Sequence, residues 1–290
     1  MMSAWRVLLL TVLGGAASLP ARAGSAQDSG FTVVSFNIRH GRGDDGAHVW
    51  SNRRTIVTEL LRGFDAPIIG LQEVLDFQLR EIANALPTHV ALGVGRDDGV
   101  SAGEFSPLLI DTTRFVLLAS GTFWLSDTPD VPGSMHWGNR ITRITSWARL
   151  VNVRTRDTVR VYNLHWDHES QPSRERSAAL LLRRIAAEGS ASDGLIVTGD
   201  FNADESNAAF QVLVRDATVS LRDSYRARYP DSRSVGTFNG FRGDSTGGKI
   251  DAVLLGPGWT VDSAGIDRRS VNGLWPSDHF PVWARVRRGR

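Results

Sequence analysis

Apolar residues follow two patterns along the chain, short continuous runs and longer stretches with helical spacing. The clearest helical stretch lies at 173–188, where Ala178, Leu181, Leu182 and Ile185 recur on one face. Helices are also predicted at 50–62 and 76–86. The short runs predict strands at 31–38, 66–71, 89–95, within 108–124, and at 145–153, 159–165, 194–198, 249–255 and 280–286. Strands that alternate with helices in this way indicate an α/β fold.

The N-terminal segment differs in character from the rest of the chain. Arg6 precedes an apolar run at 7–17, which is too short to span a bilayer because a spanning helix takes about 20 residues. Small residues at Ala21 and Ala23 complete the pattern of a secretory signal peptide. We therefore predict a signal peptide at 1–23 cut after about Ala23, with export to the periplasm or the medium. An uncleaved N-terminal anchor is the alternative.

The remainder is expected to form a single domain. The predicted boundaries are a short lead at 24–30, one folded domain at 31–286 and a basic tail at 287–290. No later segment has a long uncharged apolar run, so no transmembrane anchor is expected there, and a monomer is expected. With 290 residues, 41% of them hydrophobic, the chain is long enough to bury a sizeable core.

Charge and cysteine content exclude several functional classes. The full chain has 33 basic and 31 acidic residues. Arg6 and Arg22 are the only charged residues of 1–23, so the predicted mature chain has 31 of each sign. A neutral chain has no general field that attracts nucleic acid or anionic membranes. Because the sequence contains no cysteine, cysteine nucleophiles, cysteine–zinc sites and iron–sulfur clusters are excluded.

Polar clusters stand where the predicted apolar strands end, which is where α/β folds place their chemistry. They are Ser35-Phe36-Asn37-Ile38-Arg39, Gly70-Leu71-Gln72-Glu73-Val74, Tyr162-Asn163-Leu164-His165-Trp166-Asp167-His168, Gly199-Asp200-Phe201-Asn202, Lys249-Ile250-Asp251 and Ser277-Asp278-His279-Phe280-Pro281. Taken singly, such an Asn or Glu is more often a cap or a surface group, and such a His a hydrogen-bonded core residue.

Taken together, the clusters supply the groups that phosphoester hydrolysis needs. Carboxylate and amide oxygens suit a hard cation such as Mg²⁺ or Mn²⁺, and they come from Asn37, Glu73, Asp200, Asn202 and Asp278. His165 and His279 are titratable donors, and Asp251 is placed to orient one imidazole.

The order and spacing of these clusters resemble the endonuclease/exonuclease/phosphatase superfamily, which has the fold of pancreatic deoxyribonuclease. The resemblance covers 31–286 and is strongest to small exported bacterial members, through stretches such as Gly103-Glu104-Phe105-Ser106-Pro107 and Gly236-Thr237-Phe238-Asn239-Gly240-Phe241. It implies a four-layered α/β sandwich, in which two mixed β-sheets pack face to face with helices on the outer faces. It also implies a divalent-metal-dependent hydrolase that cleaves a phosphodiester or a phosphomonoester by in-line attack of water.

The resemblance also implies a role for each site residue. The metal ligands are Glu73 and Asn37, with Asp278 near the metal, and the catalytic residues are His165, Asp200, Asn202, Asp251, His279 and Glu104. Asp200 aligns or deprotonates the water, Asn202 contacts phosphate, and Asp251 orients His279. Glu104 is the candidate partner of His165, and Arg143 is a candidate phosphate clamp together with Asn202.

Some positions depart from the family pattern, and they affect the substrate pocket rather than the catalytic groups. Leu164 and Trp166 flank His165 where Thr and Leu are usual, Ala252 replaces an aromatic residue, and Ile110 replaces a Tyr. The substrate therefore stays open among DNA, RNA, inositol phosphates, sphingomyelin and small phosphoesters. Two alternatives also stay open, a catalytically inactive phosphate-binding module on the same fold and a calcineurin-like metallophosphatase.

Overall fold

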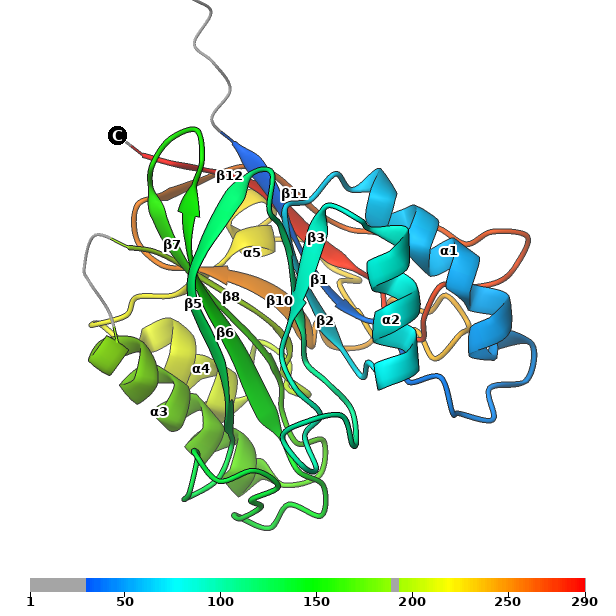
Figure 1. Cartoon of the computed structure of the whole chain (residues 1–290), viewed down its shortest axis with the longest axis horizontal. Coiled ribbons are helices and arrows are strands. Elements are labelled where there is room, and N and C mark those ends of the chain that lie inside the picture. Colours follow the sequence, from blue (N-terminus) through cyan, green and yellow to red (C-terminus); the bar gives the residue numbers. More distant parts are fainter. Residues whose placement is uncertain (1–29, 189–192, 290) are drawn as a thin grey trace, which may run out of the picture.

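Two six-stranded β-sheets pack face to face and carry helices on their outer faces (Figure 1). The computed structural model describes residues 30–188 and 193–289. The first sheet has the strand order β11-β12-β1-β2-β4-β3, and the second has the order β5-β6-β7-β8-β10-β9. Each sheet mixes parallel and antiparallel pairs, since β1 is parallel to β2 and β7 to β8 while their other neighbours are antiparallel. The four-layered α/β sandwich predicted from the sequence is confirmed.

The elements follow one another along the chain, with the longest connections at 125–143 and 229–250. The first sheet and its helices comprise β1 (Phe31–Asn37), η1 (Gly46–His48), α1 (Trp50–Gly63), β2 (Ile68–Gln72), α2 (Asp76–Ala85), β3 (His89–Leu92), β4 (Leu108–Asp111), β11 (Trp259–Ile266) and β12 (Val282–Arg288). The second comprises β5 (Phe115–Trp124), β6 (Ile144–Asn152), β7 (Thr158–His165), α3 (Gln171–Glu188), β8 (Gly194–Asp200), α4 (Ala208–Arg215), β9 (Arg222–Asp223), α5 (Ser224–Arg228) and β10 (Asp251–Leu255).

Five of these elements were not predicted: η1, α4, α5, β9 and β11. The strand β11 has no regular period-two pattern. Its register with β12 shifts between Val261 and Ser263, and the shift breaks the alternation of side chains. The elements β9, α4 and α5 are short, and short elements carry too few periodic positions to be recognised.

The ends of the predicted domain need one correction. The strand β12 includes Arg287 and Arg288, which the sequence placed in a tail, because pairing with β11 continues to Trp259 opposite Arg288. The predicted signal peptide at 1–23 lies outside the described residues, as do residues 24–29 of the lead. Within the described ranges, no helix has both the length and the apolar character needed to span a membrane.

Three apolar clusters hold the four layers together. Val33, Ile68, Val161 and Ile196 belong to a cluster between the two sheets. The outer face of the first sheet packs on α1 and α2 through a second cluster, which includes Phe36 and Leu71 from the strands and Val57 and Ile82 from the helices. A third cluster joins the outer face of the second sheet to α3 and α4, and includes Leu164, Val197, Leu181 and Phe210. Figure 1 shows the two helix pairs on opposite sides of the sandwich.

The inner faces of the sheets change from apolar to polar along the strands. Side chains alternate between faces, so every second residue of a strand points between the sheets. In β8 these residues are Ile196, Thr198 and Asp200, and in the adjacent β7 they are Val161, Asn163 and His165 at matching register. Apolar residues thus occupy one end of the inter-sheet space, a polar band follows, and ionisable groups occupy the other end.

The polar band joins the two sheets by side-chain hydrogen bonds. Asn163 Oδ1 accepts bonds from Gln72 Nε2 at 2.7 Å and from Thr198 Oγ1 at 2.9 Å. Gly70 makes this approach possible, because a Cβ at this position would lie 2.1 Å from Thr198 Oγ1. The band fixes the strand ends that carry the site.

Candidate active site

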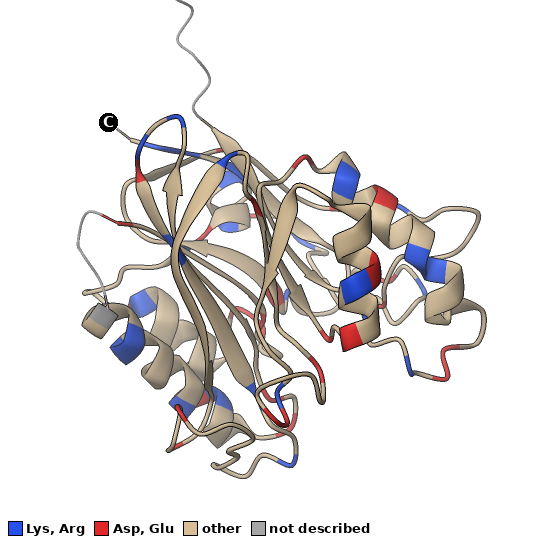
Figure 2. Ribbon diagram, in the orientation of Figure 1, with Lys and Arg blue, Asp and Glu red and all other residues tan. Residues whose placement is uncertain are grey.

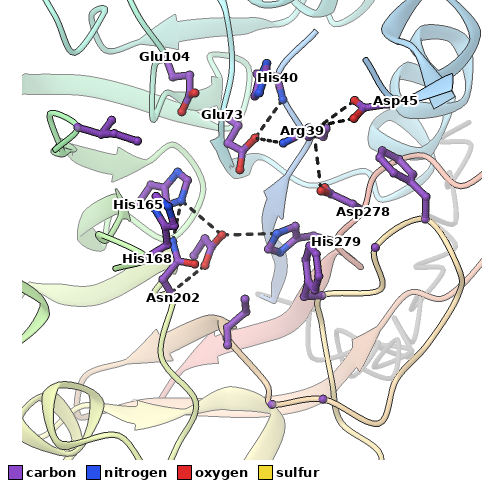
Figure 3. Close-up of a pocket in the computed structure, with 18 of the residues that line it drawn as sticks. Arg39, His40, Asp45, Glu73, Glu104, His165, His168, Asn202, Asp278 and His279 are labelled. Atoms are coloured by element: carbon purple, nitrogen blue, oxygen red, sulfur yellow. Dashed lines mark hydrogen bonds and ion pairs between the residues drawn. The ribbon is translucent and has the colours of Figure 1, made fainter. Parts of the chain in front are cut away.

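The strand ends beyond the polar band open into a pocket of about 790 Å³ (Figure 3). Most of the predicted site residues line it, namely Glu73, Glu104, Arg143, His165, Asp200, Asn202, Asp278 and His279. Asn37 and Asp251 lie behind this lining, fully buried, and hydrogen-bond to it. All the residues predicted from separate parts of the sequence therefore meet at one end of the sandwich.

Asp200 is the centre of the hydrogen-bond network at the pocket floor. Its Oδ2 accepts a bond from Asn37 Nδ2 at 2.9 Å and lies 3.6 Å from His165 Nε2 and 3.7 Å from His279 Nε2. Its Oδ1 accepts a bond from the backbone N–H of Asn202 at 2.9 Å. Burial, together with the negative charge of Asp251, raises the pKa of Asp200 to about 7. A carboxylate with these neighbours is placed to hold a water molecule and to accept its proton.

The two imidazoles beside Asp200 differ in charge state. Burial opposes a charge on His279, but the carboxylates of Asp251 and Asp200 outweigh it and raise the pKa of His279 well above its ordinary value. His279 Nδ1 donates to Asp251 Oδ2 at 2.9 Å, so Nε2 is left facing Asp200 and the pocket. Burial and the positive charge of Arg143 instead lower the pKa of His165 well below its ordinary value. The site thus holds one cationic and one neutral ring.

Asn202 connects the neutral imidazole to the backbone. Its side-chain amide donates to His165 Nε2 and to the carbonyl oxygen of Trp166, both at 2.9 Å. Asn202 has a positive φ of 45°, a conformation that Asn tolerates better than most residues. The turn after β8 thereby brings the side chain of Asn202 back towards His165 at the end of β7.

Glu73, Asn37 and Asp278 carry the ligand types that suit a hard divalent cation. Asn37 Oδ1 accepts a bond from the Arg39 N–H at 3.0 Å, and the Arg39 guanidinium lies 3.9 Å from both carboxylates. Glu73 Oε1 accepts a bond from Asn37 Nδ2 at 3.0 Å, and its Oε2 accepts one from the backbone N–H of His40 at 3.2 Å. Burial opposes ionisation of Glu73, but the bond from Asn37 and the charge of His279 outweigh it, so the pKa of Glu73 is lowered. Two carboxylates and an amide oxygen are ligands that Mg²⁺ and Mn²⁺ prefer.

A second group of possible ligand atoms is better explained by hydrogen bonding. Atoms of Asp200, Asp251 and His279 all lie within 4.8 Å of one another. However, Asp251 Oδ2 and His279 Nδ1 already bond to each other, and Asp200 accepts a bond from Asn37. Asp251 Oδ2 is thus engaged with the ring nitrogen of His279 that faces it, and the group is arranged to orient the imidazole.

Glu104 and Arg143 line the pocket, but one predicted contact is wrong. Glu104 Oε2 accepts a bond from Arg96 Nη1 at 2.6 Å, and no hydrogen bond joins Glu104 to His165 among the described residues. The reason is geometric, since Arg96 lies on the same loop and its backbone N–H bonds to the Glu104 carbonyl at 3.1 Å. Arg143 Nη2 lies 2.9 Å from His168 Nδ1 with the guanidinium at the pocket wall, so its role as a phosphate clamp stays a prediction.

Several residues that line the pocket were not assigned a role from the sequence, and Arg39 is the most central of them. It lies 3.9 Å from a carboxylate oxygen of Glu73 and 3.9 Å from one of Asp278, while Asp45 accepts its strongest bond at 2.9 Å. Its place two residues after Asn37 is the one feature that could have drawn attention to it. Arg96 and Phe238 also line the pocket and were not predicted.

Comparisons with known proteins agree with the fold. The family model described as "Endonuclease/Exonuclease/phosphatase family" matches residues 34–279. A solved protein of this family from Bacteroides vulgatus is 31% identical, with a TM-score of 0.83 over 89% of this chain and 99% of that one. A mannosyl-6-phosphatase from Bacteroides thetaiotaomicron is 34% identical, with a TM-score of 0.81 over 88% of this chain and 99% of that one. A search of curated protein sequences found no match.

More distant structures share the fold alone. TDP2 from D. rerio, solved with a single-stranded DNA product, is 15% identical, with a TM-score of 0.72 over 90% of this chain and 100% of that one. The match of the family model over most of the chain excludes the calcineurin-like alternative. The match of the family model from Val34 in β1 to His279 includes the strand ends described above. The chain therefore belongs to the endonuclease/exonuclease/phosphatase family and is a metal-dependent phosphoester hydrolase.

Proposed function

We propose that this protein is an exported, Mg²⁺- or Mn²⁺-dependent phosphoesterase that hydrolyses small phosphomonoesters. The observation that carries the proposal is the position of Asp200 Oδ2, which is 2.9 Å from Asn37 Nδ2, 3.6 Å from His165 Nε2 and 3.7 Å from His279 Nε2. A water molecule beside this oxygen would face a phosphorus atom held between the two imidazoles. The arrangement supplies a proton acceptor and hydrogen-bond donors in one place.

The reaction forms one bond and breaks one. Water attacks phosphorus in line with the leaving alcohol, and one water proton passes to Asp200 while the P–O bond to the alcohol breaks. The leaving oxygen takes up a proton from solvent and Asp200 releases its proton to solvent, so that the alcohol and phosphate are the products. His279, held by Asp251, donates from Nε2 to a phosphoryl oxygen, and Asn202 holds the ring of His165 beside it. A divalent cation held by Glu73, Asn37 and Asp278 would neutralise negative charge on the phosphoryl group.

Charge distribution favours a small substrate over a nucleic acid. Basic and acidic residues are interspersed over the ribbon in Figure 2. The pocket repeats this mixture, with Arg39, Arg96, Arg143 and Arg242 facing Asp45, Glu73, Glu104, Asp200 and Asp278. A polyanion gains affinity from a continuous basic surface, whereas one phosphate group needs only a few donors. The similarity to a mannosyl-6-phosphatase at 34% identity supports the same choice.

A substrate panel tests the proposed activity. The protein lacking residues 1–23 is assayed with a hexose 6-phosphate, phenyl phosphate, bis(p-nitrophenyl) phosphate and single-stranded DNA, each with Mg²⁺ or Mn²⁺. Hydrolysis of the monoesters should exceed that of the diesters, should stop in EDTA and should return with either metal. Faster cleavage of DNA than of every monoester would refute the substrate class, and full activity after exhaustive chelation would refute the role of the metal.

Two site variants, compared with the unmodified protein, distinguish an enzyme from an inactive phosphate-binding module. Asp200→Ala and His279→Ala should each abolish hydrolysis while circular dichroism stays that of a folded protein. Asp130→Ala is the matched control, because its side chain is 78% exposed and lies outside the pocket. Absence of turnover on the whole panel in the unmodified protein would favour the binding module.

Export is tested separately, on the full chain. Expressed in a bacterium, the protein should be recovered outside the cytoplasm with an N-terminus near Gly24. Recovery in the cytoplasm with residues 1–23 intact would contradict the proposed signal peptide.

A further inference from the structure

The hydrolysis step proposed above does not use Arg96 and Glu104, which form an ion pair in the pocket wall. Arg96 Nη1 lies 2.6 Å from Glu104 Oε2, and the two side chains are 13% and 17% exposed. Figure 3 shows Glu104 near Glu73 and away from His279. The pair therefore borders the space next to the phosphate site, where the leaving alcohol of a substrate would lie.

The loop that carries the pair is closed and attached to its surroundings. Its two sides are joined by the bond from Arg96 N–H to the Glu104 carbonyl at 3.1 Å and by the bond from Asp97 N–H to the Ala102 carbonyl at 3.1 Å. Trp124 Nε1 donates to the Arg96 carbonyl at 2.6 Å, and Thr142 Oγ1 donates to Asp97 Oδ1 at 2.6 Å. These bonds anchor the loop to β5 and to the segment before β6. A side-chain pair held in this way loses little conformational freedom when a ligand binds.

Both side chains have hydrogen-bonding positions that are not used in the ion pair. A carboxylate has about four acceptor sites and a guanidinium has five donors. Among the described residues, the Glu104 carboxylate is hydrogen-bonded to Arg96 alone. Both residues line the pocket, and apart from the buried Arg96 Nε their remaining acceptor and donor positions can reach a bound molecule. An alcohol hydroxyl both donates and accepts, and it complements a carboxylate and a guanidinium at once.

The opposite side of the pocket has an apolar surface. The Phe238 ring is 48% exposed, lines the pocket and packs edge-on against His279 with 5.1 Å between ring centroids. A negative charge at Glu104 disfavours a second phosphate in the leaving group. Polar groups on one wall and an aromatic ring on the other suit a molecule with hydroxyls and an apolar face.

We propose that Arg96 and Glu104 bind hydroxyl groups of the leaving alcohol, so that the substrates are phosphomonoesters of polyhydroxylated alcohols such as sugars. This inference rests on the proposed function, because it assigns the substrate class of the same site. It gives Glu104 a role in substrate binding in place of the pairing with His165 that the family resemblance implied.

The test compares two substrates that differ only in their hydroxyls. A hexose 6-phosphate and tetrahydropyran-2-ylmethyl phosphate both release a primary alcohol attached to a six-membered ring that contains one oxygen. The magnesium-loaded enzyme should prefer the hexose phosphate in kcat/KM by at least about 100-fold, because buried polar groups are left unpaired by the hydroxyl-free analogue. Glu104→Gln should lower this ratio by about 10-fold to 100-fold, the effect of one charge-assisted hydrogen bond.

Further variants separate recognition from structure. Arg96→Met/Glu104→Met removes both charges together and should lower the ratio at least as far as Glu104→Gln without leaving a buried charge unpaired. Glu205→Gln is the matched control, since Glu205 pairs with Arg226 at 2.7 Å outside the pocket, and it should leave the ratio unchanged.

Three outcomes would overturn the inference. The first is a wild-type enzyme that hydrolyses the two substrates equally well. The second is an equal loss of kcat/KM for both substrates in the variants, which indicates a structural role. The third is hydrolysis of neither substrate by the wild type, which removes the proposed function as well.

Discussion

His279 Nδ1 donates a hydrogen bond to Asp251 Oδ2 at 2.9 Å, and both side chains are buried. Asp251 is the first residue of β10 and pairs in register with Asp200, the last residue of β8. The bond fixes which ring nitrogen of His279 faces the pocket, and the negative charge of Asp251 stabilises the imidazolium. We therefore expect Asp251 to act on the reaction by orienting His279.

Asp251→Asn should separate orientation from substrate binding. The amide keeps the shape of the side chain but removes its charge and offers a donor where His279 needs an acceptor. We expect kcat to fall by about 100-fold or more while KM changes little, because the affected contact strengthens in the transition state. The measurement is steady-state kinetics on the magnesium-loaded enzyme. Asp76→Asn, an exposed carboxylate on α2, is the control, and a kcat within about threefold of wild type in Asp251→Asn would contradict the role.

Asp200 should reduce the stability of the metal-free protein. Its pKa of about 7 in the folded state exceeds the value of about 3.9 for an unfolded chain. The raised pKa means that burying the charged carboxylate lowers the free energy of unfolding by about 4 kcal/mol above pH 7. The hydrogen bond that an Asn would lose contributes only about 1 kcal/mol. Asp200→Asn should therefore raise Tm at pH 8 in EDTA by about 5 °C, although it abolishes activity.

The pH dependence of this effect has a definite sign. A carboxyl group with a raised folded-state pKa leaves stability intact below its unfolded pKa and reduces it as pH rises through the folded pKa. The difference in Tm between Asp200→Asn and wild type should thus be largest above about pH 7 and should shrink towards pH 4. Thermal unfolding in EDTA at pH 8, 6.5 and 5 measures it. A lower Tm for the variant at pH 8 would show that burial of the Asp200 charge does not significantly lower the stability of the folded protein.

Arg53 should be required to hold two parts of the site in place. It is fully buried, and its Nη1 donates to the carbonyl of Ile38 at 2.8 Å and to that of Pro276 at 2.7 Å. Ile38 follows Asn37, and Pro276 precedes the segment that carries Asp278 and His279. Arg53 thus fixes the distance between the end of β1 and the loop before β12.

Arg53→Lys keeps the charge but cannot reproduce the planar fork of donors. We expect the free energy of unfolding to fall by about 2–4 kcal/mol, because buried carbonyls lose their donors. The measurement is urea denaturation at pH 7.5. Arg54→Lys is the matched control, since the neighbouring Arg54 is half-exposed and pairs with Glu81, and it should change stability by less than about 0.5 kcal/mol. Equal effects of the two variants would show that Arg53 has no special role.

The strand ends were the part of the site most accessible from sequence. Period-two alternation in β7 and β8 places His165 and Asp200 on the same face as Val161 and Ile196, and the register sets His165 beside Asp200. Apolar runs that end in polar residues were therefore enough to locate the groups that strands carry.

Contacts made by loops could not be predicted from the periodicity of the sequence. The partner of Glu104 depends on how the loop from Arg96 to Glu104 closes, and loop closure follows from tertiary bonds such as that from Trp124 to the Arg96 backbone. Arg39 is similar, since its place between Glu73 and Asp278 arises from a turn with a φ of 59° and from strands distant in sequence. No local periodicity encodes these arrangements.

Gly70 should be required for the close approach of the two sheets beneath the site. A Cβ there would lie 2.1 Å from Thr198 Oγ1 and 2.5 Å from Asn163 Oδ1, both fully buried. Gly70→Ala should lower the free energy of unfolding by about 1–3 kcal/mol, as overpacking of a dense interior does. Gly63→Ala is the matched control, because a Cβ at the end of α1 meets nothing within 4 Å and should raise stability by about 0.5–1 kcal/mol.

A double-mutant cycle identifies the contact responsible. Thr198→Ala alone removes the hydroxyl that bonds to Asn163 at 2.9 Å and should destabilise the protein. In Gly70→Ala/Thr198→Ala the new methyl group enters the space that the hydroxyl has left, so the double variant should lose less stability than the sum of the two single variants. We expect a coupling of about 0.5–3 kcal/mol, measured by urea denaturation of the four proteins. If the losses are additive, the steric contact with Thr198 does not explain the glycine at this position. The contact with Asn163 and its hydrogen-bond network would then be the explanation.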